Sequence, residues 1–433
     1  MRSGGRAAAR VAFDASVPLL VVKVGRYPRH HGGLGAIRSL GRVGVPTYAM
    51  TEDRVTPAAV SRFLTARTLP PPRGMEPVEY VVERIAAAVD CVGRPVIALP
   101  TDDEGAVLLA EHRAALGSLL LVPAIDAALP RTLASKRGLS ELCDRYGFAA
   151  PRVAFPRTRP ELEQFATTAT FPIVAKAVEP FTRLRFPEHR DTVLYRTQDE
   201  LLAAFVDWPG NSAVMLQEYI PADVSEDWIF HGYFDAQSNC VVGFTGIKHR
   251  SWPPQFGLTT YATSVANTEL AALATRFCHT VGYRGIVDMD WRLDRRDGRY
   301  YLLDCNPRIG AQFRLFETDA GIDVVRALHL DLTGRAVPPG RQVERRAFVV
   351  ESLDVASRLS SNTRRSPSAP HPPKSERVER AWFAWDDPLP FVSMAVRQLG
   401  PIWKRTRARL RRVTRFTQAT RRAKRNDDRQ AIT

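Results

Sequence analysis

The chain has 433 residues, of which 45% are hydrophobic and 25% charged, and its formal net charge is +15. This length predicts two or three domains, and the absence of any run of about 18 uninterrupted apolar residues argues against a membrane-spanning helix. Asp14 and Pro18 interrupt the apolar stretch near the N-terminus, so we do not expect a cleaved signal peptide. The five cysteines are scattered, without a CxxC or Cys/His cluster. They argue against a disulfide framework or a zinc site and favour a reducing, cytoplasmic setting.

Most of the positive charge lies at the C-terminus. Residues 401–433 hold twelve Lys/Arg and two Asp, so they carry +10 of the +15. Within "PIWKRTRARLRRVTRF" apolar side chains alternate with cations. This pattern is compatible with a helix on an anionic membrane surface, with a contact to RNA phosphates, and with a solvated tail. The sequence leaves these three interpretations open.

Strands and helices alternate in the first part of the chain. Apolar runs at 19–24, 45–50, 96–100 and 119–123 read as strands, and helical spacing appears at 36–44, 81–90 and 105–117. This alternation predicts a parallel sheet and a Rossmann-like domain over 1–125. The glycines Gly32, Gly33 and Gly35 fall in the expected loop after the first strand, where such folds bind ligands. Their spacing is not GxGxxG, and a plain tight turn explains them equally well.

From about Leu133 the pattern changes to α+β with antiparallel strands. A helix stopped by Gly147 is followed by expected strands at 171–178, 214–220, 228–235, 240–246, 286–293 and 300–306. A further helix is expected over 268–282. We therefore predict a second domain over 126–340, then a Ser/Pro-rich linker and small segment over 341–400, and a basic tail over 401–433.

The stretch "LLDCNPR" places Asp304, Asn306 and Arg308 at alternate positions, so they share a face of the strand's end. A hairpin turn at "DRRDGR" would pair this strand antiparallel with the one carrying Asp290, and would bring Asp290 near Asp304. Two carboxylates and an amide oxygen suit Mg²⁺. Capping of a turn by Asp304 and Asn306 is the alternative.

Two lysines are placed to meet phosphate. Lys176 ends an otherwise apolar strand, where a buried ammonium needs an anion, and Lys136 opens a helix whose N-terminus favours anions. Each would also fit a surface lysine with a buried stem. The stretch "LQEYIP" is the third candidate: Glu218 and the backbone of Tyr219 and Ile220 suit the edge of an adenine ring.

The order of these pieces resembles the ATP-grasp superfamily, in which two α+β subdomains clamp ATP and Mg²⁺. The resemblance covers about residues 130–335, and residues 1–125 look like the domain that precedes it in such enzymes. The chain looks most like the carboxylate–amine ligase group that includes D-aspartate ligases, on "HHGGLGAIRSLGRVGVP", "LPTDDE" and "GIKHRSWPPQFG". The resemblance implies activation of a small-molecule carboxylate as an acylphosphate, attack by an amine, and release of ADP and phosphate. A homodimer stays open.

The resemblance implies a role for each candidate residue. Lys136 and Lys176 would hold the nucleotide phosphates. Glu218 and the Tyr219–Ile220 backbone would bind adenine, and Glu226 the ribose. Asp290, Asp304 and Asn306 would coordinate Mg²⁺, for which Mn²⁺ is an alternative, while Arg308 and Lys248 would face the transferred phosphate.

The sequence departs from the superfamily pattern in two places. Many members have a glycine-rich flap after the strand lysine, but residues 177–194 contain no glycine, and Asp304 stands where glutamate is commoner. Arg26, His30 and His31 are candidates for the substrate carboxylate, and His249 and Arg250 for the acceptor. Two other functions remain open: a small-molecule kinase with the same clamp, and a nucleotide-binding module with a basic docking tail.

Overall fold

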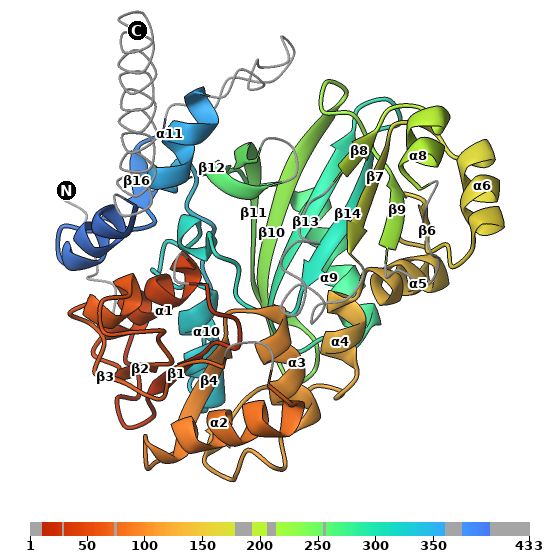
Figure 1. The fold of residues 1–433 in the computed structure, drawn as a ribbon. Coiled ribbons are helices and arrows are strands. Elements are labelled where there is room, and N and C mark those ends of the chain that lie inside the picture. The colour runs from red at the N-terminus through yellow and green to blue at the C-terminus, as the bar shows by residue number, and fades with distance from the viewer. Residues whose placement is uncertain are drawn as a thin grey trace, which may run out of the picture.

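The computed structural model describes residues 11–27, 30–72, 76–177, 193–205, 214–253, 257–359 and 375–398. It contains a five-stranded parallel sheet near the N-terminus, a seven-stranded sheet that is mainly antiparallel, and a four-stranded antiparallel sheet (Figure 1). The predicted change from alternating strands and helices to α+β is therefore confirmed. No helix in these ranges is long and apolar enough to cross a membrane.

The N-terminal sheet has the strand order β3-β2-β1-β4-β5, with every pair parallel. Its strands are β1 (Leu19–Val22), β2 (Thr47–Ala49), β3 (Ala66–Arg67), β4 (Val96–Pro100) and β5 (Leu120–Leu121). Leu19 and Val21 pack on the side of α1 (His31–Gly41), while Leu20 and Val22 pack on the side of α2 (Val78–Asp90) and α3 (Asp103–Glu111). Burial on both faces explains why β1 reads as a continuous apolar run.

The expected glycine loop is a helix instead. The α1 helix begins at His31, so Gly32, Gly33 and Gly35 lie in its first turns. A Cβ atom on Gly35 would lie 2.8 Å from the Phe313 ring, and one on Gly32 would lie 3.2 Å from the Ala311 Cα. These two glycines therefore allow the segment around η3 (Phe313–Leu315) to pack closely on α1.

The largest sheet has the order β14-β13-β10-β11-β12-β15-β16. Its strands are β10 (Ser225–Phe234), β11 (Cys240–Trp252), β12 (Leu258–Ser264), β13 (Gly285–Asp294), β14 (Arg299–Asn306), β15 (Arg346–Val349) and β16 (Arg377–Arg380). All neighbours are antiparallel except β15 and β16. The sheet thus continues past residue 340, where the sequence suggested a boundary. The reason is that β15 and β16 extend its β12 edge.

Two helices cover different parts of this sheet. The α9 helix (Thr268–Thr280) packs Leu270, Ala274 and Phe277 on one face. The α10 helix (Val324–Leu332) lies on the other face, where Tyr233 and Phe244 join the core shared with the N-terminal domain. The rest of that second face remains for polar side chains.

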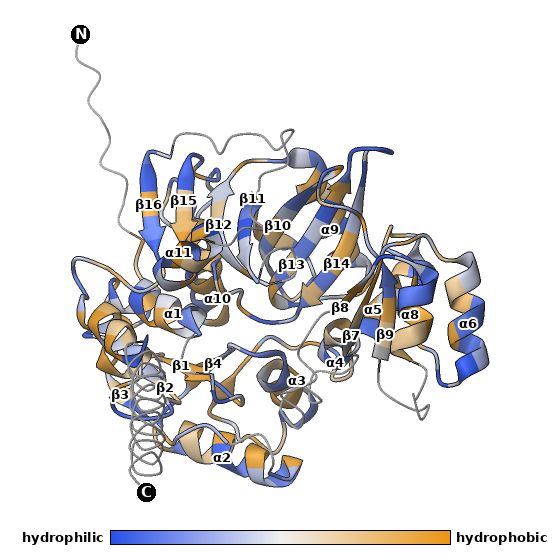
Figure 2. Cartoon of the chain, turned by 45° about the horizontal axis from the view of Figure 1, so that its top comes forward, coloured by the Kyte–Doolittle hydropathy of each residue, from blue (hydrophilic) through white to orange (hydrophobic). Residues whose placement is uncertain are grey.

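The third sheet has the order β6-β9-β7-β8. It contains β6 (Val153–Ala154), β7 (Ile173–Ala177), β8 (Val193–Tyr195) and β9 (Val214–Glu218), and it follows α4 (Leu129–Ala134) and α5 (Lys136–Tyr146). Ile173, Ala175 and Leu216 pack against α6 (Arg159–Thr168) and α8 (Gln198–Ala204). Figures 1 and 2 both place this small sheet beside β14.

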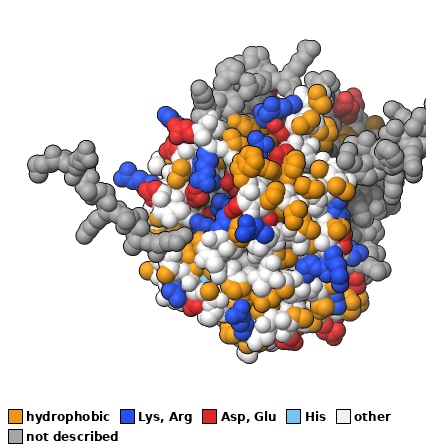
Figure 3. Space-filling view, turned by 90° about the vertical axis from the view of Figure 1, so that its left-hand side faces the viewer, with side chains coloured by type: hydrophobic (Ala, Val, Ile, Leu, Met, Phe, Trp, Pro, Cys, Tyr) orange, Lys and Arg blue, Asp and Glu red, His pale blue; other side chains and the backbone are white. Residues whose placement is uncertain are grey.

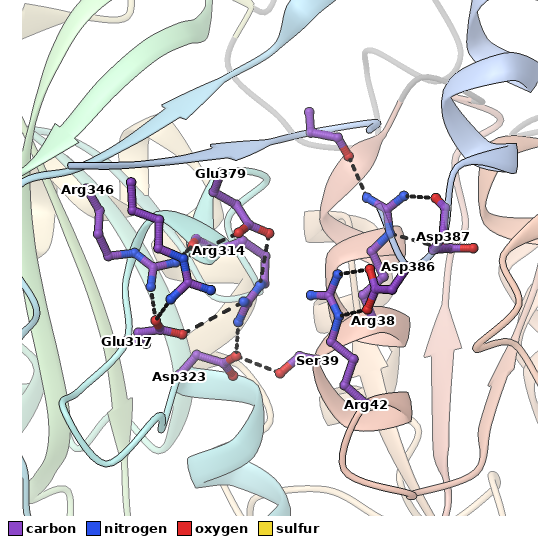
Figure 4. A network of polar contacts seen from close by, with 12 residues as sticks. Arg38, Ser39, Arg42, Arg314, Glu317, Asp323, Arg346, Glu379, Asp386 and Asp387 are labelled. Carbon is purple, nitrogen blue, oxygen red and sulfur yellow. Dashed lines mark hydrogen bonds and ion pairs between the residues drawn. The ribbon is translucent and has the colours of Figure 1, made fainter. Parts of the chain in front are cut away.

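The C-terminal segment returns to the N-terminal domain. After α11 (Glu351–Leu359) and β16, the chain crosses to α1, where Asp387 binds Arg38 and Asp386 binds Arg42 (Figure 4). A helix follows over 389–398. Most of the expected Ser/Pro-rich linker and the whole basic tail 401–433 lie outside the described residues.

Candidate active site

The large sheet has one apolar and one polar face at the level of β10 and β13. Trp228, Phe230, Met289 and Trp291 pack toward α9. Apart from Ile229, their neighbours in the alternating pattern carry charge or hydrogen-bonding groups, and Figure 2 shows the two kinds of residue in successive bands along these strands. The polar face holds Asp227, His231, Asp288, Asp290 and Arg292, by register.

A β-bulge sets the direction of the side chains on β14. Asp290 pairs with Asp304, but its neighbour Trp291 pairs with Leu302, so Leu303 has no counterpart on β13. The bulge lets Leu302 enter the apolar core while Asp304 and Asn306 stay on the polar face. The predicted hairpin, and the predicted pairing of Asp290 with Asp304, are confirmed.

Charges of both signs converge at this pair of acids. Burial raises the pKa of Asp290; Lys248 on β11 lowers it, and Asp288 and Asp304 raise it further, so the net shift is upward. Lys136, the first residue of α5, places its Nζ atom 2.5 Å from Oδ1 of Asp304. Lys136 and Lys248, two of the three lysines predicted to face phosphate, therefore lie beside the predicted metal ligands.

Asp290 and Asp304 suit a hard cation that takes its other ligands from substrate or water. Among the described residues, no group of three His, Cys, Asp or Glu side chains could hold a metal ion. The side-chain nitrogen of Asn306 donates to the Asp288 carbonyl oxygen at 3.2 Å, which leaves its amide oxygen as a further ligand atom. Two carboxylates and an amide fit Mg²⁺, which is usually bound through one or two carboxylates together with substrate phosphates and water.

Arg308 is fixed by carboxylates from two parts of the chain. Its Nη1 lies 2.9 Å from Oδ2 of Asp288, and its Nε lies 3.2 Å from Oδ1 of Asp103 on α3. The other oxygen of Asp288 lies 2.7 Å from Nε2 of the fully buried His231. Burial raises the pKa of Asp288, but His231 and Arg308 outweigh it and bring the pKa to about 2. A Cβ atom on Gly310 would collide with His231, so glycine is required there.

The expected adenine-binding segment connects the small sheet to the large one. The Glu218 and Tyr219 amides donate to the carbonyls of Arg152 and Pro172, both at 2.9 Å. The Ile220 carbonyl accepts from Nη1 of Arg292 at 2.8 Å. The segment is thus held from both sides, and it ends at the buried Ile220.

The side chain of Glu218 does not lie with the other candidates. Its Oε1 accepts from the Thr170 amide at 2.8 Å, on the face of β9 that Leu216 presents to α6 and α8. The buried Gln217 occupies the opposite face and was missed by the sequence interpretation. Counting alternate positions from Leu216, an evident core residue, would have selected it.

Glu226 is likewise on the wrong face for its expected role. It pairs with Leu293, which pairs with Tyr300, and Tyr300 belongs to the core on the α9 side. The next residue, Asp227, lies on the polar face with its Oδ1 2.7 Å from Nε of Arg292. Asp227 is therefore the acid on the polar face beside the segment expected to bind adenine, whereas the sequence predicts its neighbour Glu226 for the ribose.

Three further candidates are Lys176, His31 and Arg250. The backbone of Lys176 pairs with Met215, and its side chain, like most of the glycine-free segment 177–194, lies outside the described residues. The His31 ring packs in the core, 5.5 Å from the Phe348 ring and 5.6 Å from that of Trp382. Arg250 binds both oxygens of Asp354, at 2.7 and 3.1 Å. These contacts give His31 and Arg250 structural roles.

Comparisons with known proteins agree with this architecture. Residues 260–331 match the family model described as carbamoyl-phosphate synthase L chain, ATP binding domain. The chain is 22% identical over 293 residues to D-aspartate ligase of Enterococcus faecium (strain Aus0004), covering 64% of this chain and 68% of that one.

Solved structures show the same fold. The L-amino acid ligase from Bacillus licheniformis superimposes with a TM-score of 0.54 at 18% identity, covering 76% of each chain. The biotin carboxylase domain of Hydrogenobacter thermophilus 2-oxoglutarate carboxylase, solved with MgADP, gives a TM-score of 0.55 at 15% identity, covering 75% of this chain and 71% of that one.

The fold and these matches together indicate an ATP-dependent enzyme. The matches place residues 260–331 with an ATP-grasp ATP-binding domain, and the chain is distantly similar to D-aspartate ligase and L-amino acid ligase.

Proposed function

We propose that this protein is an ATP-dependent carboxylate–amine ligase that forms an amide through an acylphosphate and releases ADP and phosphate. The observation that carries the proposal is the meeting of Asp290 and Asp304 with Lys136 and Lys248 on the open part of the polar face. Alternating acids and ammonium groups suit a polyphosphate whose charge is shared between a cation and lysines. The similarity to two amino-acid ligases supports a carboxylate and an amine as substrates.

The nucleotide would lie along the polar face with its adenine at the segment 217–220. Gln217 and the Ile220 backbone would meet the adenine edge, and Asp227 the ribose, while Lys136 and Lys176 would hold the phosphates. Asp290, Asp304 and Asn306 would hold Mg²⁺, which neutralises phosphate charge and orients the γ-phosphate when bound. Arg308, fixed by Asp103 and Asp288, would then face the phosphoryl group as it transfers.

The reaction would proceed in two displacements. A carboxylate oxygen of the substrate attacks the γ-phosphorus, and ADP leaves. The positive charges of Lys248 and Arg308 would stabilise the phosphoryl group during this transfer. The amine then attacks the acyl carbon, phosphate leaves, and the nitrogen loses a proton as the amide forms. Neither step needs a protein nucleophile, because the substrates supply both.

A phosphate-release screen of amino acids and other carboxylates, each paired with amines under ATP and Mg²⁺, tests this function. Phosphate should appear only when a carboxylate and an amine are both present. A small-molecule kinase would instead form ADP and a stable phosphorylated product with a single substrate. The double variant Asp304→Ala/Asn306→Ala should lose turnover. Asp297→Ala, in the exposed hairpin turn, is the matched control and should keep it.

A further inference from the structure

The helix over 389–398 presents an apolar face to the outside of the molecule. Leu389, Val392 and Val396 are spaced three and four residues apart, so they share one side of the helix, and they are 57%, 52% and 63% exposed. Trp385, in the turn before the helix, is 90% exposed. Hydrophobic side chains gather on the side of the molecule where this helix lies (Figure 3). A surface helix of a globular protein normally carries polar residues at such positions.

The opposite side of the same helix is firmly attached. Met394 is buried, and Nη2 of Arg397 lies 2.6 Å from Oδ1 of Asp53. The turn that precedes the helix is held by Asp387, whose carboxylate binds Arg38 at 2.9 Å on the α1 helix (Figure 4). The apolar face is therefore displayed by an anchored element, and its outward direction is set by ion pairs on the inner side.

The sequence that follows this helix is strongly basic. The basic tail begins three residues after Gln398, the last described residue, and it holds twelve Lys/Arg against two Asp, with Trp403, Leu410, Val413 and Phe416 among the cations. The partner must therefore offer an apolar layer and a high density of negative charge together. The interface of an anionic bilayer has both properties.

Other partners fit this combination less well. RNA supplies phosphates but no apolar phase for three aliphatic side chains. A second copy of the chain would bring a second tail of charge +10 against the first.

We propose that Trp385, Leu389, Val392 and Val396 form a membrane-docking surface that inserts at the interface of an anionic phospholipid bilayer. The tail 401–433 would bind the lipid phosphates alongside.

Flotation of the full chain with lipid vesicles tests this surface. The wild-type protein should float with vesicles of phosphatidylcholine mixed with phosphatidylglycerol, but not with phosphatidylcholine alone, and added salt should weaken the binding. The triple variant Leu389→Ser/Val392→Ser/Val396→Ser should lose binding by about tenfold or more, because these side chains supply the inserted apolar area. Its thermal unfolding, followed by circular dichroism, should match the wild type, because all three residues face outward.

The matched control replaces exposed aromatic residues elsewhere. Tyr80→Ser/Tyr146→Ser removes two half-exposed rings from α2 and α5 and should leave flotation unchanged. The proposal is overturned if wild-type protein ignores anionic vesicles, or if the folded triple variant floats as well as wild type. It is also overturned if the triple variant changes only self-association in light scattering, or only RNA binding, while flotation stays the same.

Discussion

Two adjacent acids at the start of β10 show that a shift of one position along a strand decides which side chain faces the candidate site. Glu226 and Asp227 have the same charge, but the strand turns them to opposite faces of the large sheet. Only Asp227 reaches Arg292, which in turn holds the Ile220 carbonyl of the adenine segment. The sequence alone favours neither acid unless a neighbouring core residue fixes the alternation.

This difference gives a paired prediction. Asp227→Asn should raise the KM for ATP about tenfold or more with little change in kcat, because it weakens both the expected ribose contact and the hold of Arg292 on the adenine segment. Glu226→Gln should leave the KM within about twofold, because Glu226 lies on the face covered by α9. Initial rates at varied ATP concentrations check both variants. The ribose assignment fails if the two variants change the KM equally.

The pairing of the acids in the candidate metal site could be predicted from the sequence, whereas the side chains proposed to contact adenine and ribose could not. Asp304 and Asn306 alternate at the end of an apolar run, and the hairpin turn before them fixes their partner strand, so local sequence was sufficient. The bulge at Leu303, which separates Leu302 from Asp304, depends on packing against Trp291 across the sheet and has no local signature. Gln217 and Asp227 required knowledge of which face of each strand is covered by helices.

At the scale of elements, long-range packing decided what local signals left open. The glycines Gly32 and Gly35 look like a ligand-binding loop in sequence, but they belong to a helix because residues 310–314, nearly 280 positions later, press against it. The predicted strands and helices of 133–306 were placed correctly because their periodicities are strong. The sequence did not predict that the C-terminal segment packs on the N-terminal part of the chain. The contact depends on the ion pair between Arg38 and Asp387, which are far apart in the sequence.

That anchor gives a stability prediction with a neighbouring control. Arg38 and Asp387 are almost fully buried, and Asp387 also accepts from Ser61 Oγ at 2.7 Å and from the Arg62 amide at 2.9 Å. Asp387→Ala leaves the guanidinium buried without its carboxylate, which should cost about 3–5 kcal/mol. Asp386→Ala removes an exposed pair with Arg42 and should cost only about 0–1 kcal/mol. Urea unfolding measures both, and equal losses would show that the buried pair is not the anchor.

A second prediction at this scale concerns pH. His329 on α10 is fully buried and its Nε2 lies 2.9 Å from the Val17 carbonyl oxygen, so this nitrogen carries the proton of a neutral ring. Burial lowers the pKa of His329 from its usual value near 6.5, while the Val17 carbonyl and Asp14 oppose the shift and Arg335 adds to it. Below pH 6.5 His329 therefore binds a proton in the unfolded chain but not in the folded chain, and the free energy of unfolding decreases.

His329→Gln keeps a donor for Val17 but cannot titrate. The wild-type free energy of unfolding should decrease from pH 7.5 to pH 5.5 more steeply than that of the variant, and the two curves should run parallel above pH 7.5. Chemical unfolding at a series of pH values provides the test. Identical slopes below pH 6.5 would mean that another group causes the acid sensitivity.

At the scale of the whole molecule, the candidate site draws on the N-terminal α/β region and on the large sheet, which meet at Arg308. The N-terminal domain contributes Asp103 from the first turn of α3, and the large sheet contributes Asp288, so the guanidinium lies between carboxylates 185 positions apart in sequence. The Rossmann-like domain therefore does more than cover the sheet, because one of its helices fixes the direction of a group expected to face the reacting phosphate. This contact cannot be read from sequence, since "TDDEG" offers two adjacent acids and the other, Asp102, instead caps α3 and accepts from the amides of Val24 and Gly25.

The last prediction tests Asp103 as a positioning residue. Asp103→Asn keeps the size of the side chain but removes the charge that holds Nε of Arg308, so kcat should fall about tenfold. The KM for ATP should stay within about twofold, because the adenine segment is more distant and unchanged. Glu111→Gln is the control: Glu111 lies on the same helix and binds Arg131 of α4 at 2.6 Å, so it also joins the two domains, but it does so away from the reacting groups. If both variants lower kcat equally, the loss comes from weakening the contact between α3 and the rest of the chain and not from the direction of Arg308. If Asp103→Asn alone lowers kcat, Asp103 acts by orienting Arg308.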